Sequence, residues 1–119
     1  MKYQVVEEHK PNNSNPIKVR KGETVKLGRI SDEEDGWSNW IYCYCLNSTS
    51  EGWTPIQIIQ IENDYGIVKN DYSAKELDVI IGDVVDGELE LNGWLWCNRL
   101  NDFKEGWLPK EKIIALKDA

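Results

Sequence analysis

Apolar and polar residues alternate along most of the chain, and this pattern predicts short β-strands. Residues 3–6 form a β-prone run, and Ile17 and Val19 alternate with basic residues before a Lys-Gly-Glu turn. Val25 and Leu27 continue the alternation beyond the turn. No stretch has convincing helical periodicity, so the sequence predicts an all-β fold.

The strand expected at residues 40–45 alternates aromatic side chains with small apolar ones. Its two faces are Trp40, Tyr42 and Tyr44 on one side, and Ile41, Cys43 and Cys45 on the other. The aliphatic and thiol side is the better filler of a narrow barrel. We therefore expect the aromatic face to be at least partly outward, and the same holds for Trp94 and Trp96 further along the chain.

Residues 40–55, WIYCYCLNSTSEGWTP, return without a gap as residues 94–109, WLWCNRLNDFKEGWLP, with eight of sixteen positions identical. Such a repeat predicts a duplicated structural unit, with domains at residues 1–61 and 62–119. The run Tyr-Gln-Val-Val at residues 3–6 returns as Tyr-Gly-Ile-Val and opens the second unit. Only residues 62–64 separate the first unit from this opening strand of the second, so we expect two tandem small five-stranded barrels that are closely packed.

Two polar loops interrupt the first repeat. Residues 7–16 carry two prolines, three asparagines and the single histidine, His9, so we expect a long polar loop there. Residues 32–35 are all acidic but lack the ligand spacing of a calcium loop. We interpret them as solvated charge.

The net charge of −7 argues against nucleic acid as a partner, because no basic stripe is present to neutralise phosphates. The opening residues lack the apolar core of a secretion signal, and no run is long enough to span a bilayer. These features predict a cytoplasmic protein with no membrane partner.

Three cysteines without a secretion signal favour reduced thiols over disulfides. Cys43 and Cys45 share a strand face, but a zinc site would need further ligands that the chain does not place nearby. We expect buried core thiols, no metal and no cofactor. With one histidine in a polar loop and no nucleophile motif, the sequence does not predict an enzyme.

The chain resembles the SH3 domain family in its variant bacterial form, and it does so twice. In the second copy, residues 70–79 and 82–85 look like the RT loop and the diverging turn. Trp94, Cys97 and residues 105–109 look like the groove tryptophan, the small core residue and the strand that ends at the groove proline. The first copy matches at Gly22-Glu23, Trp40, Cys43 and residues 51–55.

The resemblance implies that proline-rich peptides dock between groove aromatics while RT-loop acids pair with a ligand arginine or lysine. Carried over residue by residue, the groove positions are Trp40, Pro55, Trp94 and Pro109, and the acids are Asp71 and Glu76. Two groove tyrosines of the family are replaced in both copies. The tyrosine of the opening strand is replaced by Glu7 in the first copy and by Lys69 in the second, and the tyrosine after the groove proline is replaced by Ile58 and by Lys112. Tyr72 can supply the aromatic contact surface that one of these tyrosines provides in the family.

The sequence therefore favours a non-catalytic interaction module that binds a peptide or partner protein, with basic segments preferred. Outward Tyr42 and Trp96 extend the predicted aromatic surface, although the same side chains are equally suited to hold two barrels together. A cell-wall or glycan-binding pair is the alternative, since aromatic faces also stack on sugar rings. We expect a monomer.

Overall fold

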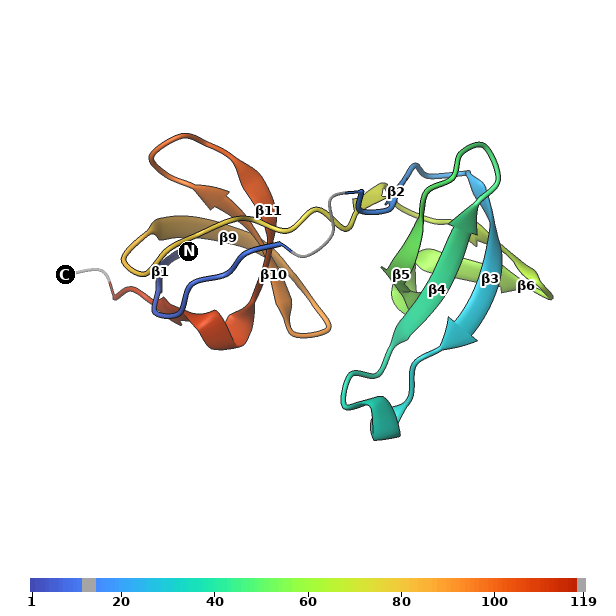
Figure 1. Ribbon diagram of the computed structural model, residues 1–119, viewed down its shortest axis with the longest axis horizontal. Helices are drawn as coiled ribbons and strands as arrows, with labels where there is room; N and C mark the ends of the chain where they lie inside the picture. Colours follow the sequence, from blue (N-terminus) through green and yellow to red (C-terminus); the bar gives the residue numbers. More distant parts are fainter. Residues whose placement is uncertain (12–14, 118–119) are drawn as a thin grey trace. The chain divides into compact units, whose positions relative to one another are not determined.

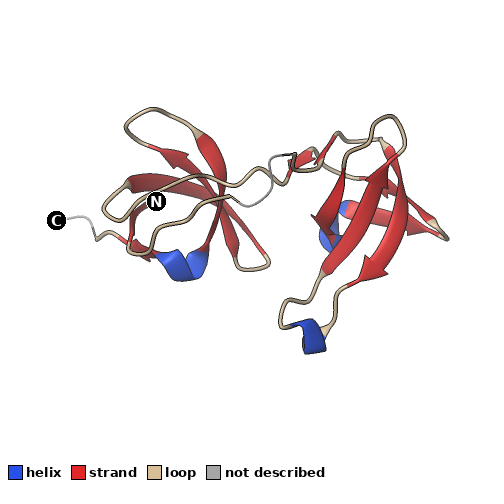
Figure 2. Cartoon of the chain, in the orientation of Figure 1, coloured by secondary structure: helices blue, strands red, loops and turns tan. Residues whose placement is uncertain are grey.

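The computed structural model describes residues 1–11 and 15–117. Over these residues the chain is all-β, with three short 3₁₀ turns and no α-helix (Figure 2). The strands are β1 (Lys2–Val5), β2 (Lys18–Val19), β3 (Thr24–Ile30), β4 (Trp40–Cys45), β5 (Glu51–Pro55), β6 (Ile59–Glu62), β7 (Tyr65–Val68), β8 (Tyr72–Ser73), β9 (Val84–Leu91), β10 (Trp94–Arg99), β11 (Glu105–Pro109) and β12 (Ile113–Ala115). The 3₁₀ turns are η1 (Glu33–Asp35), η2 (Ile56–Ile58) and η3 (Lys110–Lys112).

The strands form two five-stranded antiparallel sheets with the orders β5-β4-β3-β7-β6 and β11-β10-β9-β1-β12, and a small ladder joins β2 to β8. These sheets are SH3-like, as the sequence predicts. The blue opening strand β1 lies in the same sheet as the gold to red strands of the second repeat, between β9 and β12 (Figure 1).

The domain boundaries predicted from the repeat are wrong. One compact unit combines residues 1–12 with residues 75–119, and we call it the split unit; the other, residues 13–74, we call the central unit. The reason lies in strand pairing, because β1 pairs with β9 and β12 of the second repeat while β7 pairs with β3 and β6 of the first. Each sheet is thus completed by the opening strand of the other repeat.

The register of the exchanged strands differs by one residue from the sequence alignment. Tyr3 faces Val85 of β9, whereas Gly66 faces Val25, the matching residue of β3. Tyr3 and Gly66 therefore occupy equivalent positions, and the alignment of Tyr3 with Tyr65 is wrong.

The core of the split unit lies on the inward face of its sheet. Its buried residues are Val5, Leu77, Val79, Val85, Leu95, Cys97, Leu108 and Ile113, with Tyr3 packed against them. In the central unit Ile41 and Cys43 are equally buried. The predicted inward face is confirmed at these positions, whereas Cys45 is half-buried.

The aromatic face is outward to the extent predicted. Trp40, Tyr42, Trp94 and Trp96 are half-buried, and Tyr44 is 38% exposed. The opening sequence pattern thus assigns the two faces of β4 and β10 correctly.

The two polar loops have different outcomes. His9 of the first loop is buried and forms a backbone bridge with Val79, so its assignment to a polar loop is wrong; residues 12–14 of that loop lie outside the described residues. In the acidic loop, Asp32 caps η1 and Asp35 pairs with Arg29 at 2.9 Å. Glu33 and Glu34 are exposed, which agrees with solvated charge.

Candidate functional site

A tryptophan and a proline lie side by side at the same place in both units. The pairing of β10 with β11 sets Trp94 opposite Pro109, and the pairing of β4 with β5 sets Trp40 opposite Pro55. The sequence repeat predicted both pairs, and the strand registers bring each pair together. They mark one candidate groove in each unit.

In the split unit, a row of polar side chains continues from Trp94. The indole ring meets the imidazole of His9 edge to face, with 5.8 Å between the ring centroids. His9 Nε2 lies 2.6 Å from Glu76 Oε1, and His9 Nδ1 lies 3.1 Å from the ammonium of Lys112. A neutral imidazole with its proton on Nε2 satisfies both contacts, since it donates to Glu76 and accepts from Lys112.

His9 is a groove residue that the sequence analysis missed. It pairs with Val79, and Tyr72 pairs with Val19 at the matching place in the central unit. His9 therefore stands where Tyr72 stands in the other unit. The repeat could have identified His9, but only if the opening segment of each copy had been assigned to the other copy.

Asp71 and Tyr72 lie in a different unit from the one predicted. The sequence placed them beside Trp94, but β8 pairs with β2, so both belong to the central unit with Trp40. Tyr72 is only 8% exposed, and Asp71 accepts a hydrogen bond from the backbone N–H of Lys21 at 2.8 Å. Of the two predicted acids, only Glu76 lies in the unit of Trp94.

The central groove is more closed than the split-unit groove. Pro55 is fully buried, whereas Pro109 is half-buried. Ile58, which follows Pro55 in η2, is also buried, whereas its repeat partner Lys112 is half-buried beside His9. The split unit consequently offers more proline surface to a ligand.

Tyr42 and Trp96 each pack within their own unit. Tyr42 meets Trp53 at 5.3 Å between ring centroids, and its hydroxyl donates to Glu51 at 3.1 Å. Partial burial, followed by the nearby Glu51 carboxylate, raises the pKa of Tyr42. Trp96 meets Trp107 in the same way at 5.3 Å. Both predicted contact residues thus already have aromatic partners.

Further aromatic residues join the cluster in the central unit. Trp37 packs edge to face on Trp53 at 4.6 Å, and the guanidinium of Arg29 lies 5.2 Å from the Trp53 ring centroid. Trp37 remains 40% exposed. Trp37 was not predicted as a contact residue, because it lies in the loop that was interpreted only from its acidic side chains.

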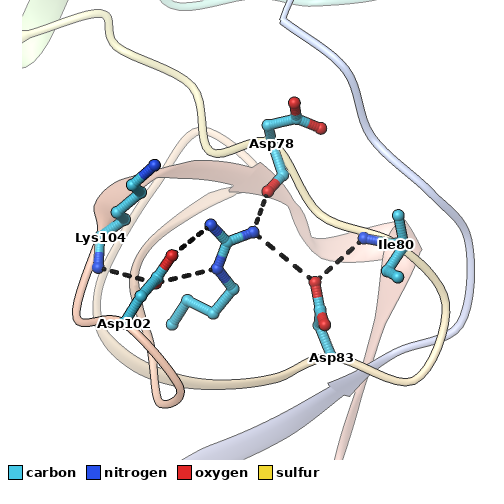
Figure 3. A network of polar contacts seen from close by, with 6 residues as sticks. Asp78, Ile80, Asp83, Asp102 and Lys104 are labelled. Carbon is cyan, nitrogen blue, oxygen red and sulfur yellow. Dashed lines mark hydrogen bonds and ion pairs between the residues drawn. The ribbon is translucent and has the colours of Figure 1, made fainter.

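A pocket of about 640 Å³ lies in the split unit between residues 75–83 and residues 99–104. Arg99 is one of the lining residues and binds the Asp102 carboxylate at 2.7 Å, the Asp78 carbonyl and, at 3.7 Å, the Asp83 carboxylate; Figure 3 shows this network of polar contacts. The Arg99 guanidinium lowers the pKa of Asp102 to about 2. Each of the three guanidinium nitrogens donates a hydrogen bond, so this network ties the two loops together.

The thiols are in different environments. Burial raises the pKa of Cys43 to about 11 and that of Cys97 to about 12. Burial also raises the pKa of the half-buried Cys45. Among the described residues, no group of three or more histidine, cysteine or acidic side chains is placed to hold a metal ion. The described part of the chain also has no helix long and apolar enough to cross a membrane.

Comparison with known proteins gives one family. The variant SH3 domain family matches residues 2–62, about half of the chain, and the chain belongs to this family. The match begins with β1, which the structure places in the split unit, and ends with β6 of the central unit. No curated protein and no solved structure matches the chain significantly. SH3-type domains are in general non-catalytic modules that bind proteins or peptides, and this is the class of protein that the chain represents.

Proposed function

We propose that the protein binds an extended segment of a partner protein in the groove of the split unit, formed by Trp94, Pro109, His9 and Glu76. The observation that carries the proposal is the row of a half-buried indole, an imidazole and a carboxylate on neighbouring elements. An aromatic platform next to an acid suits a peptide that has an apolar extended stretch and a basic residue.

The apolar part of this recognition would come from Trp94 and Pro109. A polyproline II segment has no internal hydrogen bonds and little conformational freedom to lose, so it docks on aromatic surfaces at low entropic cost. Because Trp94 is only half-buried in the free protein, it retains surface that such a ligand can cover. Tryptophan is also among the residues that most often dominate binding energy at interfaces.

The polar part would come from Glu76. Its side chain is 25% exposed, and one carboxylate oxygen is already bonded to His9. An arginine of the ligand can share this carboxylate, because a carboxylate accepts several hydrogen bonds. The net charge of −7 adds a long-range preference for basic ligands.

We also infer that the repeated residues 94–109 make the split unit a second member of the same fold family, so that each unit carries a groove. Full burial of Pro55 leaves the central groove with less proline surface than the split-unit groove, where Pro109 is half-buried. The split unit is therefore the stronger binder of the two.

The test is an NMR titration of the ¹⁵N-labelled full chain with proline-rich peptides that contain arginine, and with the same peptides after arginine is replaced by glutamine. Trp94→Ala should raise Kd about thirtyfold, as expected for an interface residue worth about 2 kcal/mol. Its effect on stability should stay below the ~3–5 kcal/mol of an emptied aromatic core site. Phe103→Ala is the matched control, because Phe103 is an aromatic of the same unit that is 74% exposed.

Glu76→Gln separates the polar contribution from the apolar one. It should weaken the arginine peptide several-fold and leave the glutamine peptide unchanged. Equal binding of all peptides by the wild type and Trp94→Ala would contradict the proposal. Co-sedimentation with purified cell-wall fragments, without any peptide binding, would replace it by the glycan-binding alternative.

A further inference from the structure

The gap between β9 and β12 is a strand-binding site, which we call the slot. It is filled by β1, whose strand pairings are all with β9 and β12. Beyond β1, the backbone N–H groups of Val6 and Glu7 donate to the Lys112 carbonyl, and His9 pairs with Val79. The opening segment thus finds these partners within the second repeat.

The slot is shaped for an aromatic side chain. A Cβ at Gly87 of β9 would collide with Leu95 Cδ2 and would stand 2.9 Å from Tyr3 Cε2. Real Cβ atoms essentially never approach another heavy atom so closely, so any side chain at position 87 would have to displace both Leu95 and the ring of Tyr3. Glycine at position 87 therefore leaves room for Tyr3 packed beside Leu95.

The equivalent gap in the central unit has the opposite shape. Leu27 stands where Gly87 stands, since each pairs with the matching cysteine, Cys43 or Cys97. The strand that fills this gap carries Gly66, whose Cβ would lie 3.0 Å from Leu27 Cδ2 and 2.6 Å from Ile59 Cγ2. A strand bearing Tyr3 would put its ring on Leu27. The first repeat consequently excludes its own opening strand.

The competitor that reproduces every contact of the slot is the identical β1 of a second chain, whereas β7, with glycine in place of Tyr3, would leave the space of the ring empty. The contacts of β1 with β9 and β12 do not depend on which chain supplies it. Within one chain, the covalent connection holds β1 near the slot at an effective concentration on the order of 1 mM. A second copy competes when chains fold together at similar concentration.

We propose that the slot accepts the opening strand of a second copy of this chain, giving a reciprocally exchanged dimer when chains fold together at high concentration. The dimer preserves the pairing of Tyr3 with Val85 and the burial of Val5 in the core. The proposal is independent of the peptide groove and goes beyond it.

The test uses two variants of the full chain that each carry one added surface cysteine, Gln4→Cys and Ile114→Cys, both made with Cys45→Ser. Gln4 faces Ile114 across β1 and β12, and both side chains are exposed, so a disulfide between them reports the pairing. The variants are mixed, unfolded under reducing conditions, refolded at about 1 mM and at about 10 µM, and then oxidised in a glutathione buffer. By mass action the ratio of linked heterodimer to monomer should rise about a hundredfold between the two concentrations.

The matched control replaces the Ile114→Cys variant by Gln60→Cys. Gln60 faces Ile67, which occupies in the central unit the position that Gln4 occupies in the split unit. The pair Gln4→Cys and Gln60→Cys should not link, because Leu27 excludes Tyr3. Light scattering after gel filtration identifies the dimers. Monomers alone at both concentrations would overturn the proposal, and so would linkage of Gln4→Cys to the Gln60→Cys variant as efficient as its linkage to the Ile114→Cys variant.

Discussion

Replacing Gly66 by tyrosine should change stability in opposite directions in two versions of this protein. In the full chain, a Cβ at Gly66 lies 2.6 Å from Ile59 Cγ2, below the separation that real Cβ atoms show. The ring adds a further conflict with Leu27. Forcing extra atoms into a packed core typically costs about 1–3 kcal/mol, so Gly66→Tyr should lower the free energy of unfolding by at least that amount.

In residues 62–119 produced alone, β1 is missing and β7 is the strand available to fill the slot. Gly66 would then take the place of Tyr3 opposite Val85, and the space beside Gly87 that the Tyr3 ring occupies in the full chain would be empty. Tyr3 is half-buried, and full burial of a large apolar side chain is worth about 1.5–3 kcal/mol. Gly66→Tyr should therefore stabilise this fragment by about 1–2 kcal/mol.

Urea unfolding followed by tryptophan fluorescence measures both free energies. Ile67→Tyr is the control, because Ile67 lies next to Gly66 on the exposed face of β7 and should have little effect in either protein. A change of the same sign for Gly66→Tyr in the full chain and in the fragment would refute the complementarity of Tyr3 with Gly87 and of Gly66 with Leu27.

Three further predictions follow from single residues. Val5→Ala should cost about 1–3 kcal/mol and raise amide hydrogen exchange in β9 and β12 but not in β3; faster exchange in β3 would contradict the strand assignment. Cys45 should react first with Ellman's reagent in the native protein, because burial protects Cys43 and Cys97 and raises the pKa of each; rapid reaction of all three thiols would be inconsistent with this. The pKa of Asp102 falls from its ordinary value of 3.8 to about 2, so its ion pair stabilises the fold above about pH 4, and this contribution is lost as the pH falls toward 2. Asp102→Asn should flatten that acid-induced loss in thermal melts, and an unchanged slope between pH 4 and pH 2 would contradict the role of Asp102.

The faces of the strands could be predicted from the sequence because alternation depends only on local geometry. Cys43 and Cys97 occupy alternate strand positions that were predicted to point into the core, and both are fully buried. The repeat also located the Trp and Pro pairs, since the registers of β4 with β5 and β10 with β11 depend on nearby residues.

The exchange of opening strands could not be predicted in the same way. The runs at residues 3–6 and 65–68 are similar in hydrophobicity, and either fits the pattern of an opening strand. What distinguishes them is the size of one side chain, Tyr3 or Gly66, against a residue far along the chain. Such a contact becomes visible only after the register is known.

The candidate site inherits that difficulty. The residues around His9 have the composition of a polar loop. The backbone bridge to Val79 is what places His9 beside Trp94. The same exchange moves Asp71 and Tyr72 to the central unit. Residues close in sequence to a groove tryptophan therefore did not identify its neighbours in space.

The exchange of β1 and β7 between the two repeats is tested most directly by NMR on the full chain in dilute solution. Cross-strand proton contacts between the backbones of Tyr3 and Val85, and between those of Gly66 and Val25, are the predicted result. Contacts of Tyr3 with Val25, and of Gly66 with Val85, would mean that each repeat closes on its own opening strand and would contradict the account.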